Sequence, residues 1–358
     1  MRVLLTMAFV VLLSSGAFTQ GKFSGYMIGD YFYNVHRDGG LGTLSNVATP
    51  GSTAMQAFQF RRIYFAYDND VSEKFTSRFR LEADQAALTG DGKITTFVKD
   101  AYLRWKNIFG SSDFLFGLQP TPAFEVSEAA WGYRSIEKTI MDLRKIVDSR
   151  DLGISLKGKL TQDGMVNYWV MIANGAGTSK PENDKYKRYY GHLQVKPTQS
   201  LQVTLNFDYG DRADKTDPYH TGEKVGNATT TISGFAGYVL EKINVGIEGF
   251  VQSTANGYDN GTALASQRGI GLSLFGSYSL ASDLAVVGRY DYLDPNTDTN
   301  TKAYGDIRHY ILAGLSWKPD KNVSVIPNIQ YETYETLANG TSVDASLTVR
   351  LTLYYIFL

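Results

Sequence analysis

The sequence contains no cysteine, only nine prolines among 358 residues, and no excess of charge of either sign. Without cysteine, a disulfide-stapled scaffold, a thiol catalyst and a cysteine-ligated zinc site are all excluded. Lys and Arg number 35 and Asp and Glu number 36, which gives a formal net charge of −1. A dedicated nucleic-acid-binding protein is excluded as well, because phosphate binding requires a concentrated basic surface.

Long hydrophobic runs are missing after the first twenty residues. Arg2, the apolar stretch 3–13 and the small residues at 14–17 predict a secretory signal peptide over 1–20, with cleavage between Ala17 and Gly21. The alternative is a membrane anchor, but the stretch is only about half the roughly 20 residues that a spanning helix needs. The remaining residues, 21–358, are expected to form a single domain. The lack of long hydrophobic runs does not exclude membrane-spanning β-strands, because their hydropathy signal is weak.

Tyrosine and glycine are abundant, with 24 Tyr and 35 Gly, and apolar and polar residues alternate along much of the chain. Over 201–209 the odd positions are apolar and the even ones polar, and 347–357 shows the same period of two. Together with turn signals, this pattern predicts about sixteen strands, of which the second and the tenth alternate poorly. The predicted strands are 22–35, 57–68, 75–86, 95–106, 113–119, 150–160, 165–174, 187–196, 200–210, 228–240, 243–254, 267–279, 283–293, 307–318, 322–335 and 343–357.

The connections between these strands alternate between brief turns and long loops rich in Gly, Asn, Asp and Thr. One short end and one long end is typical of outer-membrane barrels, whereas a soluble sandwich has no reason to sort its loops this way. Aromatic residues close to the strand ends, such as Trp105 and Trp317, also favour a barrel with interfacial girdles. The fold class is therefore predicted to be all-β, a transmembrane antiparallel β-barrel. About sixteen strands leave an aqueous channel, so diffusion of small hydrophilic solutes and ions is the predicted function.

Residues 120–149 form the longest insertion between two predicted strands. Ile136, Ile140 and Leu143 have the spacing of one helix face, and Ser135 stands where a cap would be. A loop this long with charged and apolar residues is typically functional. We expect it to fold into the lumen and constrict the channel; the alternative is a loop over the outer mouth or at a subunit contact. Its charged candidates are Glu125, Glu128, Arg134, Glu137, Lys138 and Arg144.

Several segments occur in the order and spacing of a known porin family. They are 60–65 (Phe-Arg-Arg-Ile-Tyr-Phe), 100–103 (Asp-Ala-Tyr-Leu), 116–120 (Phe-Gly-Leu-Gln-Pro), 149–156 (Ser-Arg-Asp-Leu-Gly-Ile-Ser-Leu) and 173–175 (Ala-Asn-Gly). Over residues 57–180 the chain resembles the phosphate-selective porin O and P family. The resemblance implies a sixteen-stranded homotrimer in the bacterial outer membrane, in contact with lipid and lipopolysaccharide, with an inward-folded third loop.

Charged residues on the polar faces of the strands are the expected lining of the pore. They are Arg78, Arg80, Glu82, Arg104, Lys157, Lys159, Arg188, Glu248, Arg289 and Arg350. Because acids share these faces with the cations, a mixed lumen should orient dipolar solutes and prefer neither sign strongly. Transport of anions such as phosphate stays open.

Other chemistry finds little support in the sequence. The four histidines are far apart and none lies in a hydrolase signature; His192 is expected to face the lumen and His309 the lipid. Residues 294–305 begin like a calcium loop but lack its Gly and Glu, which leaves a solvated loop or a weak surface site. No cofactor and no metal are predicted. The alternatives to a porin are a secreted or surface β-rich binding protein without a channel and, less favoured, a barrel enzyme.

Overall fold

A computed structural model describes residues 21–38, 51–178, 184–297, 307–336, 340 and 342–358. The predicted signal peptide at 1–20 and most of the predicted loop at 294–306 lie outside these residues.

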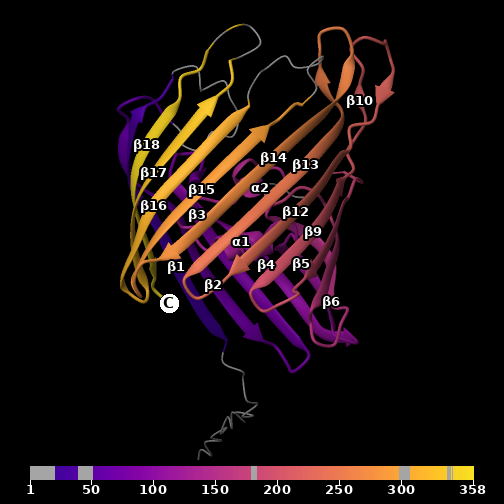
Figure 1. The fold of residues 1–358 in the computed structure, drawn as a ribbon. Coiled ribbons are helices and arrows are strands. Elements are labelled where there is room, and N and C mark those ends of the chain that lie inside the picture. Colours follow the sequence, from indigo (N-terminus) through magenta and orange to yellow (C-terminus); the bar gives the residue numbers. More distant parts are fainter. Residues whose placement is uncertain (1–20, 39–50, 179–183, 298–306, 337–339, 341) are drawn as a thin grey trace, which may run out of the picture.

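Sixteen strands of the described residues close into one antiparallel barrel, in which each strand pairs with its neighbours in chain order and β1 pairs with β18 (Figure 1). A separate two-stranded hairpin, β10 and β11, rises at one end of the barrel. The barrel strands are β1 (Lys22–His36), β2 (Gln56–Asp70), β3 (Phe75–Leu88), β4 (Ile94–Phe109), β5 (Ser112–Pro120), β6 (Arg150–Lys159), β7 (Val166–Ala173), β8 (Arg188–Val195), β9 (Leu201–Gly210), β12 (Thr229–Val239), β13 (Ile243–Asp259), β14 (Leu264–Ser279), β15 (Leu284–Asp294), β16 (Arg308–Asp320), β17 (Val323–Tyr334) and β18 (Ser346–Ile356); the hairpin strands are β10 (Lys215–Thr216) and β11 (Lys224–Val225).

The alternation of the sequence sorts side chains between the two faces of the barrel wall. On β9, Leu205 is 57% exposed on the outer face, whereas its neighbour Asn206 is buried inside. On β18, Leu351 is 48% exposed outside and Thr352 is fully buried inside. An apolar outer face around a polar interior is the reverse of a soluble protein and suits a barrel whose outer face meets lipid.

The predicted all-β barrel is confirmed, and each of the sixteen predicted segments overlaps one barrel strand. Two differences concern the loops. The predicted loop 211–226 contains the β10–β11 hairpin, and β13 and β14 extend beyond their predicted ends, which shortens the predicted loop 255–266 to residues 260–263. A period of two does not reveal where a strand leaves the membrane, so strands that continue above it are underestimated.

Residues 120–149 lie inside the barrel and contain two short helices, α1 (Glu125–Trp131) and α2 (Ile140–Leu143). We call this segment the inner loop. α1 contacts β12 and β13, and α2 contacts β14. The left-handed Gly132 ends α1, as glycine commonly does after a last helical turn.

The predicted helix through Ile136, Ile140 and Leu143 was wrong in its first turn: Ile136 lies outside α2, and Thr139 rather than Ser135 precedes the helix. The cause is competition for backbone carbonyls. Arg61 donates to the carbonyls of Ser135 and Ile136. In the predicted helix, these two carbonyls would instead accept hydrogen bonds from backbone N–H groups of the next turn.

No helix in the described part of the chain is long and apolar enough to cross a membrane.

Candidate functional site

The inner loop rests on an apolar patch of the inner wall. Trp131 and Ile136, both almost completely buried, pack among Phe235, Phe275 and Tyr310 from β12, β14 and β16. The rings of Trp131 and Phe275 lie 5.3 Å apart at 63°, an edge-to-face arrangement that aromatic pairs favour. These aromatic residues occupy inward positions that are polar elsewhere, and they hold the loop against the wall of β12–β16.

Polar contacts tie the inner loop to widely separated strands. The Arg61 Nη1 on β2 donates to the Ile136 carbonyl over 2.8 Å, and Arg350 on β18 lies 3.5 Å from the Glu137 carboxylate. Arg289 on β15 donates to the Lys138 carbonyl. The turn 135–138 is therefore held from both sides of the β1–β18 junction.

Two further contacts fix the helices. Ser127 Oγ on α1 donates to Glu248 Oε1 on β13 over 2.6 Å, and Arg144 after α2 donates to Glu332 on β17 over 2.6 Å. Because all four side chains are buried away from competing water, each contact is stronger than an exposed one would be.

Two β-bulges bring extra charges to the inner face of the wall. The β1–β2 register slips at Arg61, so that Arg61 pairs with Asp30 and Arg62 with Glu82, both inside the barrel. The β3–β4 register slips at Lys99, which lies 2.9 Å from the Glu82 carboxylate while Asp100 also points inward. A bulge places two consecutive side chains on one face, and bulges are frequent beside functional sites.

The wall and the inner loop together form a set of ten ionised groups, which we call the charged cluster. Glu82 pairs with Arg62 and Lys99, and Asp100 lies 2.6 Å from Arg80 and 2.5 Å from Arg150. On the loop, Arg134 lies 2.6 Å from Glu128 and 3.2 Å from Asp142, whose other oxygen is 3.4 Å from Lys138. The members are Arg62, Arg80, Lys99, Arg134, Lys138, Arg150, Glu82, Asp100, Glu128 and Asp142.

One contact joins the loop half of the cluster to the wall half: Arg134 Nη1 donates to Tyr64 Oη over 3.1 Å. Burial alone would raise the pKa of the Asp142 carboxyl, but Lys138 and Arg134 outweigh it and hold that pKa well below its usual range. Asp142 is therefore charged at any physiological pH. With six cations against four acids, the cluster carries two positive charges in excess.

A cavity of about 490 Å³ lies between α1 and the wall strands β4–β9, at the end of the barrel with short turns. Four cations line it, Arg104, Lys157, Lys159 and Lys196, together with the acids Asp113 and Glu125. We call it the lysine pocket.

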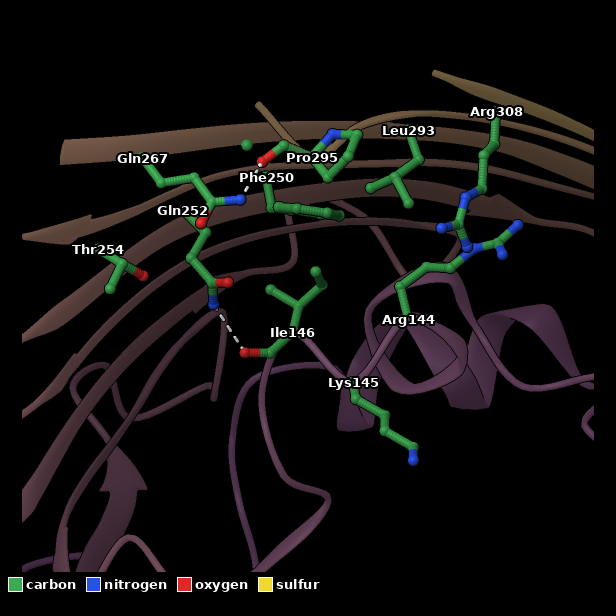
Figure 2. Close-up of a pocket in the computed structure, with 11 residues that line it drawn as sticks. Arg144, Lys145, Ile146, Phe250, Gln252, Thr254, Gln267, Leu293, Pro295 and Arg308 are labelled. Carbon is green, nitrogen blue, oxygen red and sulfur yellow. Dashed lines mark hydrogen bonds between the residues drawn. The ribbon is translucent and has the colours of Figure 1, made fainter. Parts of the chain in front are cut away.

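A second cavity, of about 220 Å³, lies on the long-loop side between the end of the inner loop and β13–β16. Its lining includes Arg144, Lys145 and Arg308, and Figure 2 shows Gln252 reaching from β13 to the Ile146 carbonyl, over 2.8 Å. Cations thus stand on both sides of the charged cluster as well as within it.

The residues expected to line the pore fall into four groups. Arg80 and Glu82 belong to the charged cluster, and Arg104, Lys157 and Lys159 line the lysine pocket. Glu248, Arg289 and Arg350 are buried beneath the inner loop that they support. The remaining two form ion pairs within the wall, Arg78 with Asp68 and Arg188 with Asp208.

The residues expected on the constriction loop divide similarly. Glu128, Arg134 and Lys138 belong to the charged cluster, and Glu125 lines the lysine pocket. Glu137 and Arg144 are buried against the wall. Of the histidines, His192 lines the lysine pocket and His309 is exposed on the outer face.

Sequence reasoning placed Asp100 on a lumenal face but did not name four other members of the charged cluster as lining residues. They are Arg62, Lys99, Asp142 and Arg150. The signal that could have found the wall residues is the pair of adjacent charges, Arg61-Arg62 and Lys99-Asp100, each inside a strand pattern. Adjacent charges cannot both face inward in a regular strand, so they indicate a bulge.

The barrel agrees with what comparison with known proteins finds. Residues 145–357 match the BBP2 family, described as beta-barrel porin-2, OmpL-like. The chain belongs to the BBP2 porin family. No curated protein matches the chain.

Solved structures share the fold at low sequence identity. The outer membrane channel DcaP of Acinetobacter baumannii has a TM-score of 0.68 and 13% identity, covering 96% of this chain and 99% of that one. An anion-selective porin from Comamonas acidovorans gives 0.62 and 14%, covering 94% and 99%. The trimer form of OmpT from Vibrio cholerae gives 0.59 and 15%, covering 94% and 99%.

This porin resides in the bacterial outer membrane, where it forms a channel for passive diffusion, and it is not an enzyme. The expectation of an outer-membrane porin is confirmed at this level, with BBP2 as its family. In such barrels the short turns face the periplasm and the long loops the outside.

Proposed function

We propose that this porin admits small hydrophilic solutes with a weak preference for anions, phosphate among them, and that the inner loop forms its constriction. The observation that carries the proposal is the charged cluster, to which β2–β6 contribute four cations and two acids and the inner loop contributes two cations and two acids. Anions passing such a ring are favoured, and the paired charges create a transverse field that orients dipolar solutes.

The size of the preference follows from Coulomb's law. A unit charge about 4 Å from an ion in water contributes about 1 kcal/mol, or about fivefold in occupancy. Because most charges in the cluster are paired within 3.5 Å, the two in excess dominate the net field. A several-fold preference is expected, well below strict selectivity.

The test is the reversal potential of the purified porin in a planar bilayer under a potassium chloride gradient. Lys138→Glu removes the excess charge of the cluster and should abolish the anion preference or turn it into a cation preference. Lys93→Glu makes the same change at an exposed external turn, where the lysine is 80% exposed, and should leave the potential as it is. An unchanged potential in Lys138→Glu would refute the assignment of the filter to the charged cluster.

The constriction itself is tested by conductance. Deleting residues 126–145 removes both helices and should raise the single-channel conductance. Unchanged conductance from an intact barrel would mean that another part of the lumen is narrowest.

We also propose that the porin is a homotrimer whose outer face meets lipid and lipopolysaccharide. The trimer form of the Vibrio cholerae OmpT, which shares the fold, supports this assembly. Light scattering of the detergent-purified protein should give three times the mass of the mature chain. Conductance steps should then appear in groups of three.

A further inference from the structure

The lysine pocket is built from rows of residues that face one another across three neighbouring strands. In one row Lys157 on β6 stands opposite Trp169 on β7, which stands opposite His192 on β8. In the next row, closer to the short turns, Lys159, Asn167 and Gln194 stand in the same order. Lys196 follows two residues after Gln194 on the same face. The opposite wall of the pocket is α1, through Glu125, Val126 and Ala129.

The three lysines of the pocket differ from the cations of the charged cluster. Each cluster cation lies within 3.5 Å of a carboxylate, and Arg104 at the pocket edge donates to Asp113. For Lys157, Lys159 and Lys196, by contrast, no ion pair is formed within the described residues. Lys157 Nζ instead lies 4.1 Å from the centre of the Trp169 ring, a cation–π contact.

A second observation also indicates a missing acceptor. Trp169 is 5% exposed, lines the pocket, and its indole N–H has no hydrogen-bond partner. Asn167, Gln194 and Gln202 add side-chain amides to the lining. A buried indole N–H is costly to leave unpaired, and Lys159 and Lys196 are exposed to the water in the same cavity, so a ligand with several acceptor oxygens could pair with them.

The spacing of the lysines indicates how the negative charge of such a ligand is distributed. Alternate residues of a strand lie about 7 Å apart, and strands separated by one neighbour lie about 10 Å apart. Lys157 and Lys159 therefore present one separation along β6, and Lys159 and Lys196 a second across β7. The three lysines are thus anchored at separate points around the pocket, an arrangement that favours an anion with a charge at each end over a single compact one.

We propose that the lysine pocket is a binding site for small dicarboxylates on the periplasmic side of the constriction. The proposal rests on the channel function argued above and specifies one solute class for it. Glu125, on the helix that faces the lysines, opposes anion entry and limits the affinity, so the solute is retained briefly and released. A site of this kind raises the local concentration of dicarboxylates at the inner mouth of the channel.

The experiment is block of chloride current by succinate in planar bilayers that contain porin of one orientation. Succinate should reduce the current when added on the short-turn side, and less when added on the other side. Acetate, with a single carboxylate, should need about tenfold more. Lys159→Gln combined with Lys196→Gln should weaken the block by succinate about tenfold or more, because two of three charge contacts are lost.

The matched control combines Lys242→Gln with Lys321→Gln, two exposed lysines on short turns at the same barrel end that do not line the pocket. This control should leave the block unchanged. Equal block from both sides, or equal block in the pocket variant and the wild type, would overturn the proposal. Calorimetric titration of the detergent-solubilised porin with succinate separates the two proposals. Binding without conduction would refute the channel function and leave the site, whereas conduction without binding would refute the site alone.

Discussion

Replacing Trp131 by alanine should release the inner loop without unfolding the barrel. Trp131 is 1% exposed, packs against Phe275 and Arg289, and donates its indole N–H to the Glu137 carbonyl over 2.8 Å. Truncating a buried tryptophan typically costs about 3–5 kcal/mol. The cost falls on the docked loop, because the wall strands keep all their backbone pairs.

The consequence for the channel follows from this magnitude. A loss of about 3–5 kcal/mol lowers the ratio of docked to undocked loop by a factor of about a hundred to a few thousand. The variant should therefore show frequent transitions between the wild-type conductance and a larger one, measured in single-channel recordings at constant voltage. Trp131→Phe, which keeps most of the buried surface, should show intermediate behaviour.

The matched control is Trp317→Ala, the same substitution on the outer face, where the tryptophan is 47% exposed. Its recordings should be as quiet as those of the wild type. A folded Trp131→Ala barrel with wild-type conductance and noise would refute the view that this side chain holds the constriction in place.

Three further predictions concern other parts of the molecule. A cysteine that replaces Arg80 should react with a water-soluble thiol reagent added to reconstituted channels, whereas a cysteine that replaces the outward-facing Phe79 should be protected from it. The opposite result would mean that the register of β3 is inverted. In the β10–β11 hairpin, the 2.9 Å contact with Asp217 raises the pKa of His220, so the pair stabilises the hairpin below about pH 6.5 and loses this effect as the pH rises through the raised pKa. Asp217→Asn should lower the His220 pKa measured by NMR titration. An unaltered pKa would exclude the contact. Gly153→Ala should lower the temperature at which the barrel unfolds, measured by the gel mobility of heated samples. The Cβ of the alanine would lie 2.2 Å from a backbone carbonyl oxygen of β7 that cannot move away. An unchanged unfolding temperature would show that β6 and β7 can separate locally.

The barrel itself could be predicted from the sequence because each strand obeys one rule. Lipid outside the barrel and water inside it impose a period of two on every spanning strand. Because every backbone group must be paired in lipid, the sheet must also close into a barrel. The strand ends could be predicted less well. Residues 255–259 continue β13, but apolar and polar residues no longer alternate there, so the period of two does not mark the end of the strand.

The constriction could be predicted only in part, because it depends on departures from that rule. Bulges at Arg61 and Lys99 rotate neighbouring charges onto one face. Phe235 and Phe275 are apolar residues at inward positions, which weakens the alternation of their strands and marks where the inner loop docks. The poor alternation of 228–240 is itself a signal of that contact.

The attachment of the inner loop also has a mechanical consequence. A barrel wall that is one sheet thick resists expansion, because its backbone hydrogen bonds run around the circumference, but it deforms easily under a lateral force. The inner loop crosses the lumen of this barrel. It is attached to β2 through Arg61, to β18 through Arg350, and to β13 through the contact of Ser127 with Glu248. Since packed interiors are nearly incompressible, we expect the inner loop to resist lateral pressure from the bilayer and the cross-section of the channel to change little with membrane tension.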